Sequence, residues 1–169
     1  MRMKKSMSKP KKSAETGRTP MDAALRYLGS RARTVREVER HLDAGEYGEV
    51  EVYETVERLK ELGLLNDVAF AEEFVRTRLA TKPVSRAHLR QQMLAHETDA
   101  EAIEQALSSL EGDAEANNAV QIAEKYARQY ARLPEDERRE MVMRRLISRG
   151  YSYDDARAAF AGVTEERDI

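Results

Sequence analysis

Residues 59–79, LKELGLLNDVAFAEEFVRTRL, contain the end of one helix and the start of another. Gly63 follows a leucine-rich face and stands where a left-handed residue commonly ends a helix. Asn66 or Asp67 can then accept hydrogen bonds from the open N–H groups of the next helix. In that helix apolar residues recur at every fourth position, so one stripe should face a core. The residues expected in this core are Phe70, Phe74 and Leu79.

The composition of the chain favours helices. Of its 169 residues 41% are hydrophobic, which is enough to build a core. Only 6% are aromatic, with no Trp and four Pro, and this composition is typical of an all-α protein. The chain has no Cys, so a disulfide framework and a thiolate zinc site are both excluded, and a cytoplasmic location is expected. The basic N-terminus lacks the apolar segment of a signal peptide, and no apolar run approaches the roughly 20 residues of a membrane span. We expect neither export nor membrane insertion.

The net charge of −2 conceals two differently charged segments. Residues 1–20 contain seven basic side chains and one acidic side chain, for a charge of +6, so residues 21–169 carry −8. The basic segment has few apolar residues and cannot bury enough surface to order itself. We therefore expect residues 1–20 to form a disordered basic tail, with attraction of nucleic acid as a second possible role.

The apolar pattern of the remaining chain repeats three times. The first unit is expected to begin with a helix capped by Asp22 and to continue with one capped by Thr34. Core positions of this unit reappear 51 residues later, and again after a further 53 residues, always as apolar residues. These positions are Val38, Val52, Val56 and Leu59; Leu89, Ile103, Leu107 and Leu110; and Val142, Ala156, Phe160 and Val163. The sequence thus predicts tandem repeats.

Each repeat is expected to contain three helices. In the second and third repeats the predicted helices cover residues 67–80, 85–96, 98–110, 113–133, 135–149 and 152–161, and Gly162 is expected to stop the last one. The predicted units are residues 21–63, 64–111 and 112–169. Because a three-helix unit buries little apolar surface alone, the units should stack on their neighbours. The predicted fold is therefore all-α, with three tandem three-helix repeats in an elongated, curved, monomeric array.

Motifs for common catalytic chemistry are missing from the sequence. It contains no GxxxxGK[ST] loop, GxGxxG turn, HExxH pair or GxSxG elbow, so we expect neither an enzyme nor a bound cofactor. His41, His88 and His96 are separated from one another and are interpreted as surface or boundary residues, so no metal site is predicted. Tyr126 and Tyr130 are four residues apart and could stack on bases, although packing between helices is the more common use of such a pair.

Basic and acidic side chains alternate by helix along the chain. Residues 76–96 contain five basic and no acidic side chains, whereas residues 97–124 contain eight acidic and no basic ones. The first repeat shows the same alternation, and the third repeat shows the basic half of it. Stacked repeats would align the basic helices into a partner-binding stripe, although two solvated faces would give the same pattern. The residues of this predicted stripe are Arg36, Arg40, Arg76, Arg78, Lys82, Arg86, Arg90, Arg138, Arg139, Arg144, Arg145 and Arg149.

Several of these segments resemble the RecX family of bacterial recombination regulators over about residues 22–163. The most specific are LKELGLLND followed by AFAEEFVRTRL, and the late segment RRLISRGYSYDDA, which contains the turn RGYSYD at residues 149–154. The resemblance implies three tandem three-helix repeats, which the spacing predicts separately. Asn66 replaces an Asp that is usual in the family, and Val84 and Ser85 stand where a Gly is frequent. These departures affect packing more than membership of the family.

The resemblance also implies a function. A RecX-like protein would be a non-enzymatic modulator that binds RecA, lies in the groove of the RecA filament on single-stranded DNA, and restrains strand exchange, ATP hydrolysis and co-protease action. The acidic charge of residues 21–169 argues against strong DNA binding without RecA, so only weak direct contact with DNA is expected. Two alternatives share the same helical pattern: a helical DNA-binding transcription regulator, which would need dimer symmetry, and a helical scaffold for another partner.

Overall fold

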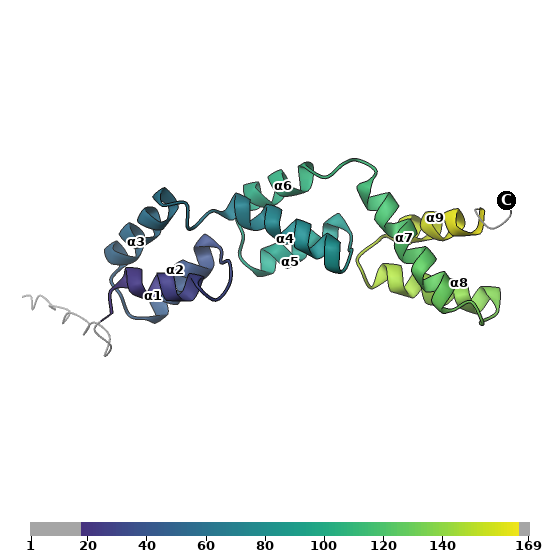
Figure 1. Ribbon diagram of the computed structural model, residues 1–169, viewed down its shortest axis with the longest axis horizontal. Coiled ribbons are helices and arrows are strands. Elements are labelled where there is room, and N and C mark those ends of the chain that lie inside the picture. Colours follow the sequence, from purple (N-terminus) through teal and green to yellow (C-terminus); the bar gives the residue numbers. More distant parts are fainter. Residues whose placement is uncertain (1–17, 166–169) are drawn as a thin grey trace, which may run out of the picture. The chain divides into compact units, whose positions relative to one another are not determined.

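The computed structural model describes residues 18–165, and these residues form helices without any strand (Figure 1). The predicted basic tail lies outside the described residues except for Arg18, Thr19 and Pro20. The helices are α1 (Pro20–Leu28), α2 (Val35–Ala44), α3 (Glu49–Glu61), α4 (Asp67–Thr81), α5 (Arg86–Ala95), α6 (Ala100–Ser108), α7 (Ala114–Gln129), α8 (Glu135–Ile147) and α9 (Tyr153–Glu165). No helix in residues 18–165 is both long and apolar enough to cross a membrane.

The helices form three domains, each with its own hydrophobic core. One core lies within α1–α3 and the turn after α3, one within α4–α6, and one within α7–α9. Of the repeated core positions predicted from the sequence, all are buried except Leu110, which is partly buried against the second core. The predicted all-α fold with three tandem repeats is therefore confirmed. Within the described residues, 18–66 form one compact unit, and 67–165, which contain the second and third domains, form another.

Side-chain caps set the starts of several helices. The hydroxyls of Thr34 and Ser85 accept hydrogen bonds from the backbone N–H groups of the first turns of α2 and α5, as the sequence predicts for Thr34. The first helix starts earlier than predicted, because Thr19 rather than Asp22 is its cap. The Asp22 carboxylate instead accepts from the Thr19 backbone, which completes a reciprocal capping box.

The turn between the second and third helix has the same backbone form in every domain. Left-handed residues occur at Glu46, Glu97 and Gly150, with φ of 61°, 54° and 87°. The offsets between these positions are the 51 and 53 residues that relate the three cores. Gly63 is also left-handed, with φ of 69°, as the sequence predicts for the end of the first domain.

Two predictions about packing need correction. The helix α9 continues through Gly162 to Glu165, because Phe160 and Val163 on either side of the glycine are buried in the third core and hold the helix together. Phe70 is buried, but Phe74 and Leu79 are only partly buried, packed against the second core. His96 lies edge-on to Phe70 and Phe74, with ring centroids 5.7 Å apart in both pairs.

Candidate partner-binding surface

The predicted basic residues of the first domain and of α4 lie mainly on the surface. Arg36 is 72% exposed and pairs with Glu39 on the same helix at 2.9 Å, and Arg40 is exposed. On α4, Arg76 is exposed and pairs with Glu73. Lys82, just after α4, is also exposed. Pairs of this kind in water are worth only about 0–1 kcal/mol, so these cations remain available to a partner.

Arg78, also on α4, is held differently. Its side chain is partly buried, and its Nε is buried without a hydrogen-bond partner among the described residues. Arg78 is therefore less accessible to a partner than Arg76, two residues earlier on the same helix.

Arg90 of α5 is held by the neighbouring acidic helix. Its Nε and Nη2 donate to the two carboxylate oxygens of Glu104 on α6 at 2.7 and 3.0 Å. This hydrogen bond raises the pKa of the Arg90 guanidinium and lowers the pKa of the Glu104 carboxyl, so both stay charged at neutral pH. The basic and acidic helices of the second domain therefore neutralise each other in part.

The helix α8 presents basic side chains in two settings. Arg138 is partly buried, Arg139 is exposed, and Arg144 is exposed and pairs with Glu140 one turn earlier. Arg145 instead donates from Nε and Nη2 to the hydroxyl of Tyr130 on α7, at 3.1 and 3.0 Å. The partner of Arg145 is thus a hydroxyl rather than a carboxylate, so the contact orients the guanidinium without placing it in an ion pair.

Tyr126, Tyr130, Arg145 and Arg149 form a tyrosine–arginine cluster. The two rings are stacked with centroids 6.1 Å apart, and Arg145 and Arg149 lie 5.4 and 5.7 Å from the Tyr126 ring centroid. Arg149 Nη2 also donates to the Tyr126 hydroxyl at 3.1 Å, and this bond lowers the pKa of Tyr126. The tyrosines thus pack against the third core, as the more common use of such a pair predicts, and they also hold two arginines; stacking on bases stays a prediction. The sequence contains a signal for this cluster, because the two tyrosines and the two arginines are each spaced four residues apart.

Arg149 also joins the second and third domains. Its Nη1 donates to the carbonyl of Pro83 at 2.9 Å, and its own carbonyl accepts from the backbone N–H of Ser85 at 3.0 Å.

Arg86, at the N-terminal end of α5 next to Ser85, also makes contacts within the chain. Its Nη2 donates to the carbonyls of Leu110 and Glu111 at 3.2 and 2.9 Å, while its backbone N–H donates to Glu115 on α7 at 3.0 Å. Because Arg86 and Arg149 are used within the chain, they are poor candidates for contact with a partner.

The predicted stripe therefore divides into two groups. Arg86 and Arg149 serve the junction between domains, whereas Arg139, Arg144 and Arg145 of α8 are exposed. Arg90 of α5, in the same compact unit, is partly buried and paired with Glu104. Arg139, Arg144 and Arg145 carry positive charge with little burial, which suits contact with phosphates or carboxylates.

Models of the three domains of one protein family match the chain in order. The first three-helix domain of RecX matches residues 21–59, the second residues 66–107, and the third residues 113–160. Together these matches cover most of the chain.

Individual relatives agree with the domain matches. The chain is 30% identical over 145 residues to the regulatory protein RecX of Bacillus subtilis, a match that covers 86% of this chain and 55% of that protein. It is 33% identical over 98 residues to the regulatory protein RecX of Chlorobium phaeobacteroides, with 58% and 65% covered. The chain thus spans little more than half the length of the Bacillus relative.

The fold resembles that of a solved structure. A crystal structure of RecX from Lactobacillus salivarius superposes with a TM-score of 0.76 at 27% identity, covering 86% of this chain and 94% of that one. The matching domains, their order and this shared fold lead to one conclusion: the chain belongs to the RecX family of regulatory proteins.

Proposed function

We propose that this chain regulates homologous recombination by binding RecA and its filament on single-stranded DNA, and that it inhibits the recombinase, ATPase and co-protease activities of RecA. The regulatory role comes from the family, and the partner is the one implied by the family resemblance. In this proposal the chain acts as a cytoplasmic monomer without a cofactor, and direct contact with DNA contributes weakly.

One observation supports a specific contact surface. Arg90, Arg139, Arg144 and Arg145 lie on second helices of two domains that form one compact unit. A RecA filament offers acidic side chains and DNA phosphates, both of which arginine binds through several donors. We place the contact on these four arginines, with Arg36, Arg40, Arg76 and Lys82 adding charge.

The test combines Arg90→Gln, Arg144→Gln and Arg145→Gln in one variant. Its matched control is Arg58→Gln, Lys60→Gln and Arg157→Gln, which removes the same charge from α3 and α9. We expect the first variant to lose inhibition of strand exchange and the control to retain it. If the lost contacts are to phosphate, the log–log salt dependence of filament binding should flatten by about 0.7 for each contact. Losses that depend on position, with little change in salt dependence, would indicate acidic side chains of RecA.

Two results would contradict the proposal. A folded triple variant that inhibits strand exchange as well as the unchanged protein would locate the contact elsewhere. Tight binding to duplex DNA in the absence of RecA would instead support the alternative of a helical DNA-binding transcription regulator.

A further inference from the structure

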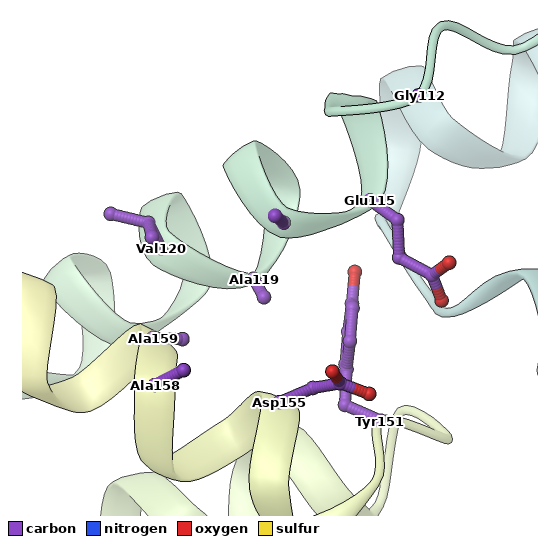
Figure 2. Close-up of a pocket in the computed structure, with 9 residues that line it drawn as sticks. Gly112, Glu115, Ala119, Val120, Tyr151, Asp155, Ala158 and Ala159 are labelled. Atoms are coloured by element: carbon purple, nitrogen blue, oxygen red, sulfur yellow. The ribbon is translucent and has the colours of Figure 1, made fainter.

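A pocket in the third domain has no part in the proposed RecA contact. It lies between α7 and α9 and has a volume of about 470 Å³ (Figure 2). The space stays open because the side chains that α7 and α9 contribute to it are small: Ala116, Ala119, Ala158 and Ala159. Cavities of a few hundred Å³ with a small number of polar groups are typical of sites for small molecules or single side chains.

One buried polar group in the pocket lacks a partner. Tyr151 is only 3% exposed, and its hydroxyl forms no hydrogen bond with any described residue. In Figure 2 the polar ends of Glu115, Tyr151 and Asp155 lie to one side and the small side chains of Ala158 and Ala159 to the other. Buried hydroxyls are nearly always hydrogen-bonded, so an orphaned one in a residue that lines a pocket suggests a ligand that hydrogen-bonds to it, as donor or as acceptor.

The pocket also carries negative charge. Glu115 and Asp155 line it, and no basic residue does. Glu115 is partly used, since its Oε1 accepts from the Arg86 N–H at 3.0 Å and its Oε2 lies 3.6 Å from Arg86 Nε. Asp155 accepts from the Ser152 hydroxyl through Oδ2 alone. A carboxylate has about four lone-pair sites, so both groups can accept further hydrogen bonds.

We propose that this pocket binds an alkyl guanidinium group, supplied either by an arginine side chain of a protein partner or by a small free guanidine. The planar guanidinium has five donors in a fixed fork, which suit several acceptors at once, and Tyr151, Asp155 and Glu115 supply acceptor oxygens around the pocket. The aliphatic stem then lies against the alanines, which leave room for it. An ammonium group concentrates its donors at one point and matches three separated oxygens less well.

The test uses the full chain without RecA, so its result is independent of the filament experiment. The probe is N-acetyl-arginine amide, and the comparison is N-acetyl-citrulline amide, which has nearly the same shape without the charge. Binding is followed by the NMR signals of the methyl groups of Ala119 and Ala159. We expect saturable shifts with a dissociation constant on the order of 1 mM for the arginine probe, and binding of the citrulline probe about tenfold weaker.

Variants locate the site. Asp155→Asn and Tyr151→Phe should each weaken binding of the arginine probe about tenfold or less. Ala158→Leu should abolish it, because Ala158 is exposed and a larger side chain fills the pocket without entering the core. Asp154→Asn is the matched control, since it removes the same charge from the adjacent position, which does not line the pocket. Thermal melts identify any variant that has lost its fold. If Asp155→Asn does not fold, Ala158→Leu still tests the proposal.

Agmatine, a free guanidine, distinguishes the two sources. If agmatine binds much more tightly than both the arginine probe and a Gly-Arg-Gly peptide, the site is assigned to a free guanidine. If the peptide binds as tightly as agmatine or more tightly, the site is assigned to a protein side chain. Equal binding of the arginine and citrulline probes, unchanged binding by Ala158→Leu, or the absence of saturable shifts would each overturn the proposal.

Discussion

The turns at Glu97 in the second domain and at Gly150 in the third have the same backbone conformation but different surroundings. Both residues are left-handed and both follow the second helix of their domain. Glu97 is exposed. At Gly150, by contrast, a Cβ atom would lie 2.6 Å from the Ser85 hydroxyl and 2.7 Å from the Cβ of His88, both in the second domain.

This difference shows that the turn of the third domain depends on contacts with a neighbouring domain, whereas the equivalent turn of the second domain lies at the surface. A left-handed residue with a side chain costs roughly 1–2 kcal/mol, a cost that the first and second domains tolerate at Glu46 and Glu97. The third domain requires glycine because the turn itself is packed against its neighbour. The same turn carries Arg149 and Tyr151, which reach the second domain and the pocket between α7 and α9. It is therefore a structural junction as well as a connection between helices.

The strongest test of this comparison is Gly150→Ala. The change combines left-handed strain with contacts under 3 Å, so we expect a loss of roughly 3 kcal/mol or more in the free energy of unfolding of residues 67–165. Denaturant melts measure the loss.

Gly63→Ala is the matched control for Gly150→Ala. Gly63 is also left-handed, but a Cβ there meets no atom within 4 Å, so only the strain of about 1 kcal/mol applies. Equal losses at the two positions would show that the packing at Gly150 is unimportant.

Much of this fold can be predicted from the sequence because the signals are local. The spacing of apolar residues fixes which face of each helix is buried, and the repeat offsets relate the three cores. Thr34 and Gly63 act within a few residues of themselves, so their roles as cap and left-handed terminator are predictable. The stop predicted at Gly162 is wrong because the glycine penalty of about 1 kcal/mol is smaller than the packing of the residues around it.

The roles of the arginines are much less predictable. Arg149 bonds to Pro83, 66 residues away in the sequence, and Arg90 bonds to Glu104, 14 residues away. A count of charges along the sequence cannot separate an arginine in a domain junction from an exposed one, because the distinction depends on contacts between helices. Tyr151 is likewise recognisable as part of a family turn, whereas its orphaned hydroxyl depends on packing among α7, α9 and the turn.

Tyr151→Phe sharpens the comparison through pH. Burial raises the pKa of Tyr151 from 10.0 to about 12. The folded protein therefore keeps this group neutral while the unfolded chain ionises, so its contribution to stability is complete below pH 10 and is lost as the pH rises to about 12. From 1.36 kcal/mol per pKa unit, the loss is roughly 2 to 3 kcal/mol.

The experiment compares the wild-type protein with Tyr151→Phe in denaturant melts across that pH range. The variant should match or slightly exceed the wild type at pH 8, since it removes an unpaired buried hydroxyl, and should lose less stability by pH 12. Tyr153→Phe, at an exposed tyrosine two residues later, is the control and should follow the wild type. Parallel curves for the wild type and Tyr151→Phe would contradict the burial of this hydroxyl.

Arg149→Met tests whether the Arg149 side chain, in the turn between α8 and α9, stabilises the junction between the second and third domains. The change removes donors to the Pro83 carbonyl and the Tyr126 hydroxyl while keeping much of the apolar stem. Hydrogen bonds from charged groups contribute about 1.5–3 kcal/mol, and partial exposure reduces this, so we expect a loss of about 2 kcal/mol in denaturant melts. Arg144→Met is the control, because Arg144 is 69% exposed in a surface pair and should change stability by less than about 0.5 kcal/mol. Similar effects of both changes would mean that the junction does not depend on Arg149.

Glu46→Gly should have the smallest effect and the opposite sign. Glu46 occupies in the first domain the position that Gly150 occupies in the third, with φ of 61°, and its side chain is exposed. Glycine removes the left-handed strain but adds backbone entropy to the unfolded chain, so the net gain should be about 0.5–1 kcal/mol, seen as a higher denaturation midpoint for the first domain. The matched change Glu46→Ala keeps the strain and should give no gain. If glycine also destabilises this position, the glutamate side chain must hold the turn, and the three turns would then differ in what stabilises them as well as in what surrounds them.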